Sequence, residues 1–312
     1  MIPNRRDSRK RIRHYRYAPQ GRHVSLRMLM AVLCILGALA AGVRLVVYLV
    51  DSCQTQEVNL AASALYHGLE KAETFETNAP LPLAGTGVLV TPLPAITPAA
   101  CQTILQKPLS KFTDLLKTNP DVVGWLTIPS MLDLPVVYRD NSYYLTHDFY
   151  RQKSGAGTLF LDMNHSLEAT SQYLLIHGHN RKDGAMFGKL QRYLSLSYYR
   201  KHPLFTFSTL YQQSAYVIFA VVVSPQNPRM EGFVDYTVHS SFATAQEFNG
   251  FVNELAKNSV FSSAIGIKED DVLLVLATCY GDDDRLLVAA RRIRKDETPS
   301  QLKRLAEDAV DR

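Results

Sequence analysis

The sequence predicts a mainly β fold, a closed β-barrel or a sandwich decorated with helices, preceded by an apolar N-terminal helix. Strand-like apolar runs dominate from residue 122 onward, helical spacing recurs only in short segments, and one long apolar run lies near the N-terminus. Many strands with few helices favour a barrel or a sandwich, because the strands must bury their apolar faces within one core. A chain of 312 residues is long enough for one or two such domains.

The expected strands are apolar runs rich in β-branched and aromatic residues. They are Val122–Ile128, Leu134–Tyr138, Thr158–Asp162, Tyr173–His179, Ser214–Val223, Asp271–Thr278 and Arg285–Ala290. Two segments space their apolar residues helically instead, residues 109–116 and residues 244–257. The sequence therefore predicts one helix before the first strand and one helix inserted between later strands.

The positive charge of the chain belongs to its N-terminus. Residues 1–23 hold eight Lys and Arg against one acid, a charge of +7, so the overall +5 leaves −2 for the other 289 residues. A nearly neutral folded part offers no basic surface by composition, which excludes general nucleic-acid binding.

The segment after this basic tail predicts a membrane anchor. Residues 24–50 are almost wholly apolar, and their uncharged core, residues 28–43, is slightly short for a span. Arg27 and Arg44 can extend toward the two interfaces and so complete the crossing. Basic residues mark the cytoplasmic side, which places residues 1–23 inside and the bulk of the chain outside the cell. The alternative, a cleaved signal peptide, is disfavoured because the run stays apolar to its end.

The remaining domain boundaries follow from composition. Residues 51–105 are expected to form a stalk, weakly helical over residues 55–75 and Pro-rich over residues 78–98. The strand-rich domain is assigned to residues 106–296, and residues 297–312 are expected to be a charged tail, either a short helix or frayed.

Four cysteines are too few for a disulfide scaffold, and none has the C-x-x-C spacing of a zinc site. Cys53 and Cys101 could pair outside the membrane, and the sequence leaves this open. Cys279 directly follows an apolar strand and precedes a polar loop, a place where a nucleophile is both rigidly backed and accessible. The alternative is a small buried hydrophobic residue, and the residue alone does not decide between the two.

His179 ends another apolar strand, where an imidazole can act as general base and acid for a thiol. His177 lies on the same strand face, so a metal site is the rival interpretation. Such a site needs a third ligand, for example Asp183, and the chain offers no further cluster of ligands. We therefore expect no metal and no other cofactor.

Arg285 opens the strand after Cys279. One interpretation is an edge residue paired with the acids at 282–284. The other is a permanent charge that the hairpin places opposite the thiol, where it can stabilise an oxyanion or hold a substrate carbonyl. The hairpin connection keeps both interpretations open.

Several long segments resemble the class B sortases, cysteine transpeptidases of Gram-positive bacteria. The matching segments are Asn119–Pro129, Asp140–Phe149, Gly155–Asp162, His177–Leu190 and Leu276–Cys279 with Arg285. They occur together and in register over residues 106–294.

This resemblance implies an eight-stranded barrel with His179, Cys279 and Arg285 as catalytic residues and Thr278 in substrate binding. It implies cleavage of an NPxTN-like C-terminal sorting signal after its Thr, through a thioacyl-cysteine. The protein would then pass to an amine of cell-wall precursor or of a pilin. The expected partners are sorting-signal-bearing surface proteins or pilins, the precursor amine and the membrane.

Three positions depart from the family pattern. Val275 stands where the family usually has Thr, His177 where it more often has Tyr, and the loop between Cys279 and Arg285 is shorter than usual. Arg291, on the same strand, is the second candidate for the catalytic arginine.

Two other functions are compatible with these residues or with this fold. One is a cysteine hydrolase that uses the same residues, and the other is a non-catalytic module of wall or pilus assembly.

Overall fold

The computed structural model describes residues 26–68, 107–167, 171–237 and 241–312. The chain divides into two compact units, residues 1–48 and 49–312. In the first unit the described part is the beginning of helix α1 (Leu26–Gly68). The large apolar side chains of this part, from Met28 to Tyr48, are all exposed. By length and composition α1 can cross a membrane, which agrees with the predicted anchor.

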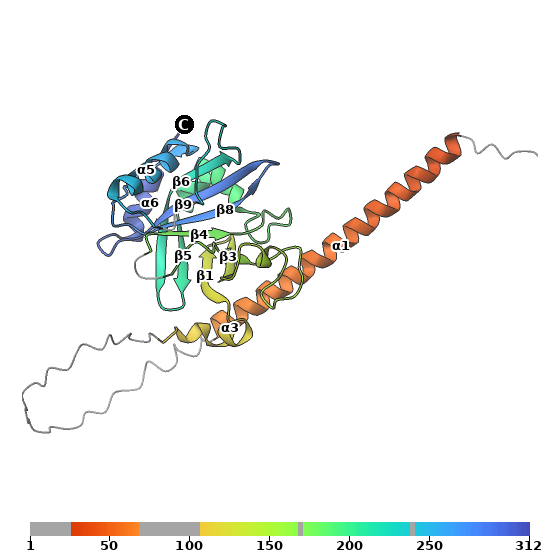
Figure 1. Cartoon of the computed structure of the whole chain (residues 1–312), viewed down its shortest axis with the longest axis horizontal. Helices are drawn as coiled ribbons and strands as arrows, with labels where there is room; N and C mark the ends of the chain where they lie inside the picture. Colours follow the sequence, from red (N-terminus) through yellow and green to blue (C-terminus); the bar gives the residue numbers. More distant parts are fainter. Residues whose placement is uncertain (1–25, 69–106, 168–170, 238–240) are drawn as a thin grey trace, which may run out of the picture. The chain divides into compact units, whose positions relative to one another are not determined.

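The second unit is built on a closed barrel of eight strands in the order β1-β2-β3-β4-β8-β9-β6-β5 (Figure 1). The strands are β1 (Val122–Ile128), β2 (Leu132–Val137), β3 (Leu159–Leu161), β4 (Tyr173–His177), β5 (Leu204–Thr209), β6 (Gln213–Pro225), β8 (Leu273–Tyr280) and β9 (Asp284–Arg292). The pairs β2–β3 and β4–β8 are parallel, and the other neighbours are antiparallel. The predicted eight-stranded barrel is confirmed, and the sandwich alternative is wrong.

Strand β8 explains why several strands are apolar at every position, with no alternation of apolar and polar residues. Leu274 and Leu276 point into the barrel core. Leu273 and Val275 point outward into a second core, which they share with the inserted helix α5 (Ala245–Lys257). A strand buried on both faces needs apolar residues at every position. Val275, one of the departures from the family pattern, is thus a buried core residue.

A third apolar cluster joins the C-terminal part of α1 to the barrel. It includes Ala62 and Tyr66 of α1, Leu115 of the short helix α3 (Thr113–Thr118) and Trp125 of β1. The rings of Tyr66 and Trp125 stack with centroids 4.3 Å apart. The first part of the predicted stalk therefore packs on the barrel as a continuous helix, and residues 69–105 lie outside the described residues.

The C-terminal segment, which was expected to be either a short helix or frayed, is helical. Helix α6 (Pro299–Glu307) begins with a capping box at Thr298 and buries Leu302 and Ala306. The remaining elements are short: α4 (Leu196–Lys201), the 3₁₀ turns η1 (Ser110–Phe112), η2 (Tyr143–Leu145) and η3 (Leu190–Leu194), and the strand pair β7 (Phe261–Ser262) and β10 (Val310–Asp311).

Candidate active site

The hairpin of β8 and β9 places Cys279 directly opposite Arg285. Side chains of directly paired residues project from the same face of a sheet, so the thiol and the guanidinium face the same space. Cys279 is exposed, which argues against the buried alternative. A tight turn at residues 281–283 joins the strands, and Gly281 has φ +58°, a conformation that suits glycine. The shortened loop therefore preserves the pairing.

His179 reaches the same place from the neighbouring strand. β4 pairs in parallel with β8 up to His177 opposite Ala277, and this register brings His179 level with Cys279. Two hydrogen bonds fix the continuation: the hydroxyl of Thr278 donates to the Gly178 carbonyl at 2.7 Å, and the Asn180 amide donates to the Cys279 carbonyl at 2.8 Å.

The tautomer of His179 follows from its partner. Its Nε2 lies 2.7 Å from the Leu145 carbonyl oxygen, which can only accept a hydrogen bond. Nε2 therefore carries the proton, and Nδ1 is the nitrogen left to exchange a proton with another group.

A pocket of about 440 Å³ contains Cys279, His179, Arg285 and Thr278. The structure thus brings the four predicted site residues together. Arg291 is not among the lining residues and is 1% exposed. Its guanidinium forms two hydrogen bonds to Glu297, at 2.7 and 2.6 Å. Arg291, the second candidate for the catalytic arginine, thus belongs to a buried structural ion pair. Arg285 is the candidate that faces the thiol.

Tyr236 lines the pocket and was not found from the sequence. Burial raises the pKa of its phenol, against the lowering effect of the adjacent Arg285 guanidinium, to which it is hydrogen-bonded. Its backbone carbonyl accepts a hydrogen bond from the Tyr173 hydroxyl at 2.8 Å. Tyr236 is therefore a neighbour of Arg285 in the pocket. No periodic pattern marks its loop, so no sequence signal points to it.

His177 also faces the pocket, where it is engaged with a buried carboxylate. Its Nε2 lies 2.9 Å from Asp162, which His165 and the Asn141 amide approach as well. Burial of Asp162 raises the pKa of its carboxyl, but the hydrogen bonds from His165 and His177 outweigh burial and hold this pKa well below its usual range.

The metal interpretation finds no support in this geometry. His177 bonds to Asp162 and His179 to the Leu145 carbonyl, so the two imidazoles have separate partners. Asp183, the suggested third ligand, is paired with Arg181 at 2.6 Å. Across the ranges that the structure describes, no group of three or more His, Cys, Asp or Glu side chains could hold a metal ion.

The depressed pKa of Asp162 predicts a pH-dependent contribution to stability. A carboxyl whose pKa is lower in the folded than in the unfolded chain stabilises the fold at pH values above its pKa in the unfolded chain, ~3.9. This contribution is lost as the pH falls through the pKa of the folded chain. We expect Asp162→Asn to lower the free energy of unfolding by about 1–3 kcal/mol at pH 7, and by less at pH 3. Urea unfolding at both pH values measures this, with the exposed Glu231→Gln as control. An equal loss at both pH values would contradict it.

No protein-family model matches the chain. Two curated relatives do. The chain is 30% identical over 188 residues to Sortase B of Listeria monocytogenes, which covers 58% of this chain and 74% of the relative. It is 27% identical over 190 residues to Sortase B of Staphylococcus aureus, covering 59% and 75%.

Solved structures show the same likeness. A Staphylococcus aureus sortase B–substrate complex superposes with a TM-score of 0.54 at 27% identity, over 60% of this chain and 86% of that one. Sortase B from B. anthracis, in complex with AAEK1, superposes with a TM-score of 0.61 over 79% of this chain and all of that one. At 20% identity this second match supports the fold alone.

Proposed function

The chain belongs to the class B sortases and is a cysteine transpeptidase, and from this premise we propose how its residues divide the reaction. One observation carries the proposal: Cys279, His179 and Arg285 line a single pocket at the ends of three adjacent strands. The pocket supplies a nucleophile, a group that can move a proton and a permanent positive charge. These are the parts that acyl transfer through a thioester requires.

In the first step, the sulfur of Cys279 attacks the peptide carbonyl after the Thr of an NPxTN-like sorting signal. Nδ1 of His179 takes the proton of the Cys279 thiol as the sulfur attacks. The C–N bond then breaks as the thioester forms, and the same Nδ1 gives that proton to the leaving amine. Arg285 stabilises the negative charge that develops on the carbonyl oxygen. Thr278 lines the substrate pocket next to the nucleophile, with its hydroxyl bonded to the Gly178 carbonyl.

In the second step, an amine of cell-wall precursor or of a pilin attacks the thioester. The C–S bond breaks and the new amide forms. His179 takes the proton from the amine through Nδ1 and passes it to the departing Cys279 thiolate, which restores the free enzyme. Arg285 suits its role because a guanidinium is a permanent positive charge with several N–H donors, and it lies beside Tyr236 in the pocket.

The first unit is proposed to anchor the enzyme in the membrane with its N-terminus in the cytoplasm. The exposed apolar part of α1 and the basic residues of segment 1–23 support this orientation. The second unit then lies outside the cell, where sorting signals are held at the membrane until they are processed. Tethering enzyme and substrate to one surface raises their effective concentration.

Transfer and hydrolysis can be separated with one substrate. We would incubate the full-length enzyme with a quenched fluorogenic NPxTN-type peptide, with and without an added amine such as triglycine, and identify the products by mass spectrometry. The proposal expects the amine-linked product to replace the free acid as the amine concentration rises. Free acid alone at every amine concentration would mean a cysteine hydrolase.

A further inference from the structure

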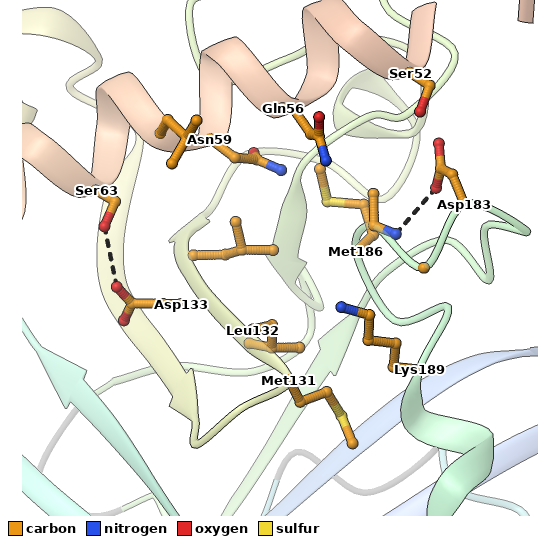
Figure 2. A pocket seen from close by; sticks show the side chains of 14 residues that line it. Ser52, Gln56, Asn59, Ser63, Met131, Leu132, Asp133, Asp183, Met186 and Lys189 are labelled. Carbon is orange, nitrogen blue, oxygen red and sulfur yellow. Dashed lines mark hydrogen bonds between the residues drawn. The ribbon is translucent and has the colours of Figure 1, made fainter. Parts of the chain in front are cut away.

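The part of α1 that belongs to the second unit is fastened to the barrel by polar contacts as well as by the Tyr66–Trp125 stack. Asp133 of β2 accepts a hydrogen bond from Ser63 at 3.1 Å and lies 2.7 Å from His67 Nε2. Figure 2 shows Ser63 and Asp133 on one side of a pocket beneath α1, with Ser52 and Asp183 on the other. The helix is thus held at two separate places.

Asp51 makes the contacts at the second place. Its carboxylate accepts a hydrogen bond from Arg181 at 2.7 Å and another from the backbone N–H of Gly155 at 3.2 Å. In the sequence, Asp51 is the first residue after the apolar run 24–50. One carboxylate therefore joins α1 to two different loops of the barrel.

Arg181 shares its guanidinium between two acids. Nε and Nη2 bond to Asp183, at 3.0 and 2.6 Å, while Nη1 bonds to Asp51. The Arg181 side chain is only 10% exposed, so water screens these charges less than it screens a surface ion pair. The hydrogen bonds to Asp183 raise the pKa of Arg181, against the effect of burial, so the guanidinium stays charged. These ion pairs thus connect the loop to α1.

Both loops that Asp51 contacts lead to His179, one to its backbone and one to its imidazole. The first follows His179 directly, and its Phe187 N–H donates back to the His179 carbonyl at 2.9 Å. The second contains Gly157, with φ +63°, where an added Cβ would lie 3.2 Å from His179 Cδ2. One segment therefore binds the backbone of His179 and the other lies beside its imidazole, and both are attached to α1 through Asp51.

We propose that Asp51 is a positioning residue of the active site, which fixes the His179 imidazole relative to Cys279 by holding the loops 154–157 and 180–185 against α1. The inference rests on the function proposed above, in which His179 exchanges a proton with the leaving amine. Proton transfer requires heavy atoms within about 3 Å, and a displacement of ~1 Å can slow a reaction up to 10²-fold. A carboxylate at the end of the anchoring segment then controls turnover without touching substrate.

The test uses the full-length enzyme in detergent. Asp51→Asn removes the charge at constant shape, and Asp51→Glu restores it. Glu57→Gln removes an exposed acid from the same helix, and His67→Ala weakens the docking of α1 at the other place. Two experiments are done on each variant. The first measures kcat and KM on the fluorogenic peptide, and the second measures the pH profile of Cys279 alkylation by iodoacetamide. The alkylation is followed by mass spectrometry of the tryptic peptide 269–285, whose single cysteine is Cys279.

We expect Asp51→Asn to lower kcat about tenfold, with KM within about twofold of the wild-type value, and to shift the alkylation profile. Asp51→Glu should recover part of kcat, and Glu57→Gln should match the wild type. His67→Ala should lower Tm but leave kcat unchanged. Asp51→Asn behaving like Glu57→Gln in both readouts would overturn the inference, as would an equal fall of kcat in His67→Ala. Peptide cleavage that survives Cys279→Ala would instead overturn the proposed function.

Discussion

Replacing Cys279 with Ala is expected to abolish peptide cleavage and transfer, a loss of at least ~10³-fold in kcat/KM. No other side chain that lines the pocket can form the thioester, because Cys279 is the single thiol among the lining residues. The measurement is the initial rate on the fluorogenic peptide with purified full-length variants.

The matched control is Cys53→Ala, which removes a second exposed thiol from the same unit. This variant should retain wild-type activity. Cleavage by Cys279→Ala at more than a few per cent of the wild-type rate would show that the nucleophile lies elsewhere. Full function of Cys279→Ala in surface-protein display would favour the non-catalytic assembly module.

The second large effect is expected at His179. His179→Ala should lower kcat by about 10²–10⁴-fold, the usual contribution of a positioned acid–base group. The physical reason is that His179 lines the same pocket as Cys279 and that its Nδ1 is available for proton transfer, since Nε2 is held by the Leu145 carbonyl. The rate of acylation, measured in a single turnover, should fall with kcat.

His177→Ala is the control, because His177 lies on the same strand face and lines the same pocket but donates to Asp162. We expect it to reduce stability more than kcat. If His177→Ala lost as much of kcat as His179→Ala, the assignment of His179 as the proton-transfer residue would be contradicted.

Much of the barrel could be predicted because its strands are buried on one or both faces and therefore read as apolar runs. β5 (Leu204–Thr209) was not among the predicted strands, because its apolar residues are separated by Thr and Ser and form no continuous apolar run. The end of β8, the start of β9 and the end of β4 were recognisable because Cys279, Arg285 and His179 stand next to the apolar runs there. The family resemblance then chose between His177 and His179.

The rest of the site could not be predicted because it depends on contacts between distant parts of the chain. Tyr236 reaches Arg285 from a loop without periodic pattern. Asp51 meets Arg181 across 130 positions of sequence. The weak helical period of residues 55–75 gave no sign that α1 would pack against Trp125, because a stalk helix and a docked helix share the same composition.

The central claim, a thioacyl-enzyme on Cys279, is tested most directly by trapping that intermediate. The wild-type enzyme is mixed with the NPxTN-type peptide without added amine, quenched in acid, and examined by intact mass and by mass of the tryptic peptide 269–285. We expect a mass increase equal to the acyl part of the peptide, located on Cys279 and removed by hydroxylamine. The account is contradicted if no adduct forms while the peptide is being cleaved, or if the adduct lies on another residue.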